Sequence, residues 1–251
     1  MSRRTEGRSY YGLRLADAHC HMELFSDPKE AAMTAKDNGV ELIITAGTNK
    51  ESNIRMINGI VDASLVFGVA GISPDFSSED GGFVDQLEEM VRKNRGIVGI
   101  GEIGLDGKMV KKAGMELQRK VFIEQIDVAN RLSIPIVVHS RGKIDEVKET
   151  VVKNKVERAV FHFFEGSESL AKELASRGYL ISIPPLEYGR MKRIINYIDL
   201  SNIVAETDSP VVGRTPFDVL KVAEKISEVK GIGIEEVCEK LTENIKNYFY
   251  I

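Results

Sequence analysis

Eight short β-rich runs alternate with longer amphipathic stretches along almost the whole chain. The runs cover residues 13–19, 40–47, 64–71, 96–104, 134–140, 158–164, 179–184 and 202–209. Several of them are almost wholly apolar, as strands that are buried on both faces should be. Strands that alternate with helices in this way predict a parallel sheet whose strands are joined by crossover helices.

The helical stretches carry recognisable end signals. They include residues 28–39, 115–133, 215–231 and 233–251. The first opens on Pro28 and closes on Gly39, the residue types that helix entry and exit favour. Eight strand and helix units in 251 residues predict a single-domain (β/α)8 TIM barrel over residues 13–251, after an N-terminal tail over residues 1–12. An open doubly wound α/β sheet is the alternative, although no GxGxxG or GxxxxGKS/T motif follows a strand.

Composition restricts the partners that the chain can attract. The formal net charge is −4, so binding of a polyanion would need a local cluster of cations. No apolar run is long enough to cross a bilayer, which argues against a membrane partner. With two cysteines and no apolar leader near the N-terminus, the sequence favours a cytoplasmic protein.

The end of the first run reads DAHCH, residues 17–21, and holds two of the four histidines in the chain. Side chains alternate between the two faces of a strand, so we expect Asp17, His19 and His21 to share a face. The two imidazoles can then converge on one ion. Cys20 is expected to point the other way and to pack in the core.

The other two histidines also fall at the ends of runs. His139 lies at the end of the fifth run and His162 towards the end of the sixth, on the face where barrel active sites are built. Glu102 in the fourth run and Asp208 in the eighth occupy equivalent positions. Buried carboxylates need a compensating partner, and a cation that is ringed by imidazoles supplies one.

These six side chains predict a hydrolytic metal centre. Four imidazoles and two carboxylates exceed what one tetrahedral zinc ion needs, so the set predicts two divalent ions about 3.5–4 Å apart with a carboxylate between them. Zn²⁺, Mg²⁺ and Mn²⁺ are alternatives. Two such ions lower the pKa of a shared water and polarise the bond under attack, which is typical of metal-assisted hydrolysis.

Four motifs of the sequence resemble those of the TatD-type metal-dependent deoxyribonucleases, a family of amidohydrolase-like metal hydrolases. They are DAHCH, GEIGLD, HSR and ETDSP, in this order. Gln118, the stretch FHFFEGS, Asn244 and Phe249 extend the likeness over most of the chain.

The resemblance implies two metal sites that are joined by Glu102. His19, His21 and Asp208 would serve one ion, and His139 and His162 would serve the other. Asp208 would also be the base or the group that orients water, so that Asp208 and Glu102 are the implied catalytic residues.

The resemblance also implies roles for residues around the metals. Arg141 shares a strand face with His139, and it either contacts a phosphate of the substrate or forms a salt bridge at the barrel rim. Asp17 is expected to orient the histidines. Glu206, deeper than Asp208 on the same face, is expected to anchor the barrel interior.

The sequence departs from the family around the substrate. Members usually carry a His-Pro-His after the third strand, where this chain has Ser73 and Asp75 around a proline. Ser73 thus stands in place of a phosphate-facing imidazole and is a candidate substrate contact, within an expected polar loop over residues 73–82. The loop after the eighth run is short and leaves Arg214 as its one cation, a second candidate contact. Phe163 replaces a frequent cysteine, which we interpret as a packing change.

Three hypotheses follow for the function. The leading one is a two-metal phosphodiesterase whose substrate is DNA or an oligonucleotide. The short loop and the missing imidazole favour a second, in which the same centre hydrolyses a small-molecule ester, lactone or phosphoester. The third is a structural metal site without catalysis, but structural zinc sites are usually closed and rich in cysteine.

Overall fold

Each of the eight predicted runs overlaps one strand of the computed structural model, which describes residues 12–59, 64–186 and 188–251. The strands are β1 (Leu15–Cys20), β2 (Val40–Ala46), β3 (Val66–Ala70), β4 (Ile97–Asp106), β5 (Ile136–Arg141), β6 (Ala159–Phe161), β7 (Leu180–Ile183) and β8 (Ile203–Ala205). They form one sheet in chain order, and every adjacent pair from β1 to β8 is parallel. A doubly wound sheet would reverse its strand order, so the prediction of a (β/α)8 barrel is confirmed.

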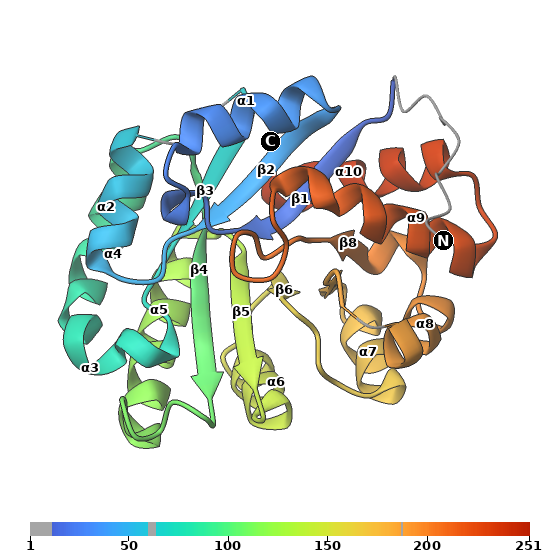
Figure 1. The fold of residues 1–251 in the computed structure, drawn as a ribbon. Helices are drawn as coiled ribbons and strands as arrows, with labels where there is room; N and C mark the ends of the chain where they lie inside the picture. Colours follow the sequence, from blue (N-terminus) through green and yellow to red (C-terminus); the bar gives the residue numbers. More distant parts are fainter. Residues whose placement is uncertain (1–11, 60–63, 187) are drawn as a thin grey trace.

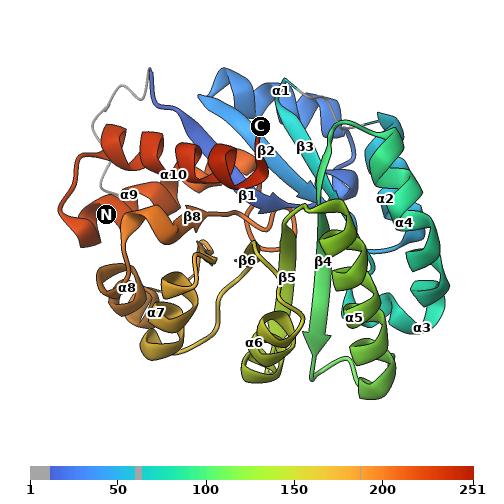
Figure 2. The same ribbon diagram turned by 180° about the vertical axis from the view of Figure 1, so that it is seen from behind.

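Helices connect the strands and surround the nearly closed barrel (Figures 1 and 2). The α-helices are α1 (Pro28–Asp37), α2 (Lys50–Gly59), α3 (Ser77–Asp80), α4 (Val84–Lys93), α5 (Met115–Leu132), α6 (Ile144–Lys153), α7 (Glu168–Ser176), α8 (Tyr188–Tyr197), α9 (Val219–Lys230) and α10 (Ile234–Phe249). Among the described residues, none of these helices is both long and apolar enough to span a bilayer. The predicted tail over residues 1–12 lies outside the described residues, apart from Gly12.

The start of α1 shows how the sequence sets a helix boundary. Pro28 occupies the first turn, and the side chain of Asp27 accepts a hydrogen bond of 2.9 Å from the backbone N–H of Glu30. Gly39 follows the helix with φ at +93°, a backbone conformation that side chains with a Cβ atom disfavour. The chain therefore turns directly from α1 into β2.

The segment after β3 differs from the irregular loop that we predicted. It contains the 3-10 helix η2 (Pro74–Phe76), the single turn α3 and the 3-10 helix η3 (Gly81–Phe83). Three further 3-10 helices are η1 (Met22–Leu24), η4 (Leu200–Asn202) and η5 (Pro216–Asp218). A single helical turn leaves little periodicity in the sequence, so a polar stretch of this kind is easily mistaken for a loop.

The core has two buried clusters. The larger one packs strand residues against the surrounding helices, with Phe122 and Phe161 among its largest side chains. The smaller one takes residues from all eight strands, such as Val69 and Val137, together with Ile245 and Phe249 of α10. A cluster that draws on every strand is the expected filling of a barrel interior.

The first and last strands meet at a seam where backbone and side-chain contacts replace a regular ladder. The backbone N–H of Asp208 donates to the carbonyl of His19 (2.9 Å), and that of His21 donates to the carbonyl of Ser209 (2.8 Å). Asp17 adds a side-chain link, because its Oδ1 accepts a hydrogen bond of 2.9 Å from the backbone N–H of Thr207. The seam therefore brings the ends of β1 and β8 together.

Candidate metal centre

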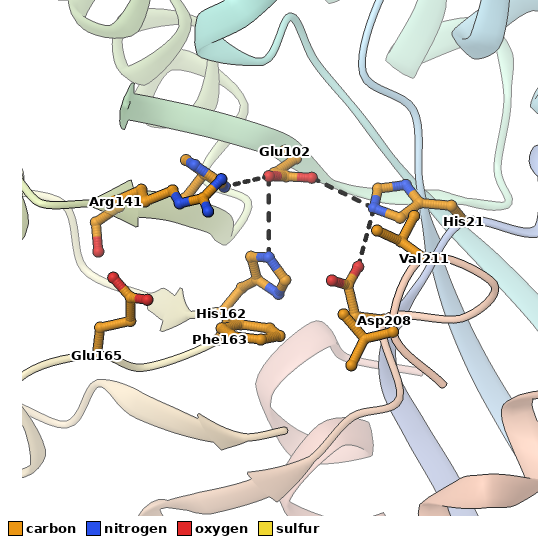
Figure 3. A pocket seen from close by; sticks show the side chains of 11 residues that line it. His21, Glu102, Arg141, His162, Phe163, Glu165, Asp208 and Val211 are labelled. Carbon is orange, nitrogen blue, oxygen red and sulfur yellow. Dashed lines mark ion pairs between the residues drawn. The ribbon is translucent and has the colours of Figure 1, made fainter. Parts of the chain in front are cut away.

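A cavity of about 360 Å³ opens at the carboxyl ends of the strands (Figure 3). It is lined by His21, Glu102, His139, Ser140, Arg141, His162, Phe163, Glu165, Asp208, Val211 and Val212. These residues come from the interior of β4, from β5, and from the segments that directly follow β1, β6 and β8. The cavity thus collects five of the six predicted ligands, and the sixth, His19, is fully buried beside it.

His19 and His21 converge at the end of β1. Their Nε2 atoms lie 3.3 Å apart, and the pairing of β1 with β2 shifts register between Asp17 and Cys20. The Nδ1 atom of His21 lies 3.1 Å from the carbonyl oxygen of Ala46, so that carbonyl fixes Nδ1 as the protonated nitrogen and leaves Nε2 for the site. Cys20 packs in the hydrophobic core, where its thiol faces the carbonyl of Ile44, as predicted.

Glu102 lies between two pairs of histidines. Its Oε2 atom is 3.6 Å from Nε2 of His19 and 3.6 Å from Nε2 of His21. Its Oε1 atom is 2.6 Å from Nδ1 of His139 and 3.9 Å from Nε2 of His162. Burial disfavours the ionised carboxylate, but the surrounding imidazoles, above all His139, hold the pKa of Glu102 well below its ordinary value.

His139 lies between two carboxylates. Its second nitrogen, Nε2, is 3.2 Å from Oδ2 of Asp106, the last residue of β4. Burial opposes protonation of His139, but its hydrogen bonds to Asp106 and Glu102 outweigh burial and raise the pKa of the imidazole to about 10. Asp106 was not among the predicted site residues, although it stands four residues after Glu102 at the end of the GEIGLD motif.

Gly104 allows β4 to pass close to β5 at this point. Gly104 pairs with His139 in the ladder and has φ at +148°. A Cβ atom on Gly104 would lie 1.9 Å from the carbonyl oxygen of His139. Only glycine fits there, so this residue sets the separation between the strands that carry Glu102 and His139.

Glu206 contacts the His162 ring at Nδ1, the nitrogen that does not face Glu102. The Nδ1 atom of His162 lies 3.1 Å from Oε2 of Glu206, and the backbone N–H of Phe163 donates to Oε1 at 2.9 Å. The hydroxyl of Ser182 donates to Oε2 at 2.5 Å. Glu206 is fully buried and occupied by these donors, which agrees with its predicted place in the barrel interior. The same contacts orient the His162 ring, which stacks on His19 with 3.7 Å between ring centroids.

Asp208 faces the β1 histidines across the seam. Its Oδ1 atom is 3.2 Å from Nε2 of His21 and 3.8 Å from Nε2 of His19. Burial disfavours the ionised form, but His21 and the neighbouring imidazoles lower the pKa of Asp208. The residue adopts φ of +50°, an uncommon conformation for a side chain with a Cβ atom, and such positions cluster at functional sites.

Asp17 supports the centre through the backbone. Its Oδ1 atom accepts from the backbone N–H of His19 at 3.3 Å, and its Oδ2 atom accepts from the hydroxyl of Thr207 at 2.5 Å. Burial raises the pKa of Asp17 well above its ordinary value. Asp17 therefore acts on His19 through the main chain and not through the imidazole ring.

The donor set fits divalent cations. Three groups of side chains each bring their donor atoms within 4.8 Å of one another: His19, His21 and Glu102; Glu102, His139 and His162; and His19, His162 and Asp208. Nδ1 of His19 and Oδ1 of Asp208 are buried and make no hydrogen bond. Buried polar atoms without a partner are costly, and a bound cation would satisfy the carboxylate oxygen.

Glu23 is a further buried carboxylate that the sequence analysis missed. Both of its oxygens are buried without a hydrogen bond, and Oε1 lies 3.7 Å from Nδ1 of His21. It follows His21 by two residues but lies in η1, beyond the end of β1, where the alternation of a strand no longer sets the direction of a side chain.

Only one of the three predicted substrate contacts lines the cavity. Arg141 is exposed at the cavity wall. Within the described part of the chain it forms no ion pair, so the structure gives no support to the alternative of a salt bridge at the barrel rim. Ser73 is buried outside the cavity and donates its hydroxyl to Asp75. Arg214 is exposed beside η5, where its backbone N–H donates to Asp218. Glu165 lines the cavity instead and lies on the same side of it as Arg141 in Figure 3.

The sequence profile of the family described as TatD related DNase matches residues 16–250. The chain belongs to the TatD-related DNase family. Human deoxyribonuclease TATDN3 is 34% identical over 265 residues, which cover 95% of this chain and 95% of that protein. The metal-dependent hydrolase YabD of Bacillus subtilis is 29% identical and covers 94% of this chain and 99% of its own length.

Solved structures of the TatD family share the fold. The TatD homologue from Escherichia coli superposes with a TM-score of 0.86 at 24% identity, over 95% of this chain and 99% of the other. A TatD family hydrolase from Entamoeba histolytica gives a TM-score of 0.84 at 18% identity, over 95% and 98%. At these identities the likeness establishes the architecture alone.

Proposed function

We propose that this TatD family member is a metal-dependent hydrolase that cleaves phosphodiester bonds in DNA or oligonucleotides. The observation that carries the proposal is the position of Glu102, whose two oxygens face two different pairs of imidazoles. A carboxylate in that position suits a bridge between two divalent ions. Two relatives, a human deoxyribonuclease and a metal-dependent hydrolase of Bacillus subtilis, support the same reaction class.

We assign the ligands as two sets that share Glu102. His19, His21 and Asp208 would hold one ion, and His139 and His162 the other, with zinc, magnesium or manganese as the metal. When bound, the ions would supply a water of lowered pKa and would polarise the phosphoryl oxygen. Glu206 would keep Nδ1 of His162 protonated, so that Nε2 faces the centre.

The residues of the chain then have separate tasks. Asp208 lies at the edge of the cavity with an unpartnered oxygen, and it would accept a proton from the attacking water or orient that water. Arg141 would hold a phosphate oxygen of the substrate, because its guanidinium is exposed at the cavity wall without an ion-pair partner among the described residues. Phe163, Val211 and Val212 would give the substrate an apolar part of the cavity wall.

The test is hydrolysis of a labelled single-stranded oligonucleotide by protein that has been reconstituted with Zn²⁺, Mg²⁺ or Mn²⁺. Cleavage should require metal, and Asp208→Ala should reduce it by a factor of at least about 100. Equal cleavage by wild type and Asp208→Ala, or no cleavage by either with metal bound, would contradict the proposal.

A small-molecule substrate is the second candidate. The burial of Ser73 and the position of Arg214 outside the cavity favour it, because both remove expected phosphate contacts. Faster turnover of a small ester, lactone or phosphoester than of any oligonucleotide would establish it. The cavity is open and the described residues bring no cysteine to it, which argues against a purely structural metal site.

A further inference from the structure

The loops that follow β4 and β5 form an exposed basic edge beside the cavity. The β4 loop, residues 107–114, carries Lys108, Lys111 and Lys112, and β5 ends at Arg141. Lys112 is occupied by Asp75 at 3.6 Å and Glu79 at 4.0 Å. The other three are exposed, and in the part of the chain that the structure describes they form no ion pair. We call Lys108, Lys111 and Arg141 the basic rim.

The basic rim is attached to the candidate metal centre. Asp106 and Arg141 are partners in the β4–β5 ladder, and the backbone N–H of Gly107 donates to the carbonyl of Arg141 at 2.9 Å. The backbone N–H of Lys108 donates to Oδ1 of Asp106 at 2.7 Å, while Oδ2 of the same carboxylate faces His139. The β4 loop therefore begins in contact with Asp106, whose carboxylate also contacts the proposed metal ligand His139.

The charge of the rim contrasts with that of the whole protein. The chain carries a formal net charge of −4, so it offers no general attraction to a polyanion. Three cations without ion-pair partners, one of them on the cavity wall, would concentrate phosphates at this side of the cavity. Glu102 lines the cavity and is buried, so a phosphodiester has to enter the cavity to reach it, which favours a single strand or a chain end over a duplex.

We propose that Lys108 and Lys111 bind backbone phosphates of a single-stranded DNA segment that extends from the cavity past Arg141. The inference rests on the proposed function, because it assigns the path of the same substrate. Neither lysine lines the cavity, so they act on the flanking nucleotides and not on the reacting phosphate.

The test compares the variant Lys108→Gln/Lys111→Gln with the control Lys153→Gln/Lys155→Gln, which removes the same charge near the end of α6 at the opposite end of the barrel. Binding of metal-loaded protein to a fluorescein-labelled phosphorothioate 12-mer of thymidylate is measured by anisotropy across a range of NaCl concentrations. We expect the rim variant to bind at least about tenfold more weakly at low salt. The slope of log Kd against log[NaCl] should fall by about 1.4, which is about 0.7 for each lost phosphate contact.

Hydrolysis of bis(p-nitrophenyl) phosphate is the parallel readout, because this small diester does not reach the lysines. Its turnover should change less than twofold in the rim variant. An unchanged Kd and salt slope, an equal loss in the control, or a large loss of small-diester turnover would each overturn the inference. Oligonucleotide binding with the expected salt slope but without cleavage by the wild type would instead overturn the proposed function and leave the rim assignment standing.

Discussion

Nδ1 of His139 lies 2.6 Å from Oε1 of Glu102, the shortest approach between a carboxylate and an imidazole in the candidate metal centre. Each of these residues also reaches a second partner, Asp106 for His139 and the β1 histidines for Glu102. The pair therefore links the β1 side of the cavity to the β5 side.

Glu102→Gln should lower metal content and activity together. The amide keeps the size of the side chain but loses the charge that compensates two cations, so we expect fewer bound ions per chain and a loss of hydrolysis of at least about 100-fold. Elemental analysis and an oligonucleotide assay measure the two effects. Glu165→Gln, at the exposed cavity wall, is the control and should retain its metal. Full metal content in Glu102→Gln would contradict the bridging role.

Glu206→Gln should weaken metal binding although it replaces no proposed metal ligand. The carboxylate fixes the His162 ring through Nδ1, and loss of such a partner typically costs about 10-fold to 100-fold in metal affinity. Calorimetric titration of the metal-free protein measures this change. Ser182→Ala removes a different hydrogen bond to Glu206 and serves as the control. Equal weakening in the two variants would indicate a general packing effect.

The stability of the metal-free protein should depend on pH through His139. Its pKa is raised to about 10 in the folded protein, above the value of about 6.5 that is expected when the chain is unfolded. The stabilisation is therefore fully present below about pH 6.5 and is lost as the pH rises through 10. Urea unfolding should show a larger difference in free energy of unfolding between wild type and His139→Gln at pH 6 than at pH 10. A difference that does not vary with pH would contradict this assignment.

Arg141→Ala should reduce phosphodiester hydrolysis while metal binding is retained. The guanidinium lies on the cavity wall without an ion-pair partner in the described ranges. Its removal should therefore abolish only its contact with the substrate. We expect a fall in kcat/KM of roughly tenfold or more, with only partial recovery in Arg141→Lys, because lysine cannot make a bidentate contact with phosphate. Unchanged kcat/KM in Arg141→Ala would remove Arg141 from the substrate site.

Gly104→Ala should destabilise the barrel strongly. The new Cβ atom would overlap the carbonyl oxygen of His139, and the φ of +148° is unfavourable for alanine. We expect a loss of about 3 kcal/mol or more in the free energy of unfolding, measured by urea titration. Gly114→Ala meets nothing within 4 Å and should change stability little. A near-neutral Gly104→Ala would show that β4 and β5 can separate at this point.

The barrel and the convergence of the ligands could be predicted because both depend on simple periodicities. Parallel strands of one barrel end on one face, so His139 and Glu102 were expected to meet although 37 positions separate them in the sequence. The contact between Asp106 and His139 depends on the register of β4 against β5, which the sequence pattern does not contain. Register also decides which side chain at the end of a strand reaches a neighbour and which reaches solvent.

The substrate contacts were the least predictable part of the site. Ser73 was expected at the cavity because it stands where the family usually carries a phosphate-facing histidine, but the chain enters η2 at the next residue and turns the hydroxyl towards Asp75. Arg214 lies in a segment whose path depends on the capping of η5 by Thr215 and Asp218. Local hydrogen bonds of this kind redirect a loop within two or three residues, which strand periodicity cannot capture.

The position of the candidate metal centre at the seam between β1 and β8 means that a bound cation would help to close the barrel. His19 lies in β1, His21 directly follows β1, and Asp208 follows β8, so a cation held by all three would join the two ends of the barrel. Removal of the bound cation with a chelator should leave the middle of the barrel, from β3 to β6, largely protected from hydrogen exchange. Backbone amides of β1 and β8 should exchange faster, because only a few backbone hydrogen bonds and the Asp17 carboxylate would then hold the two strands together.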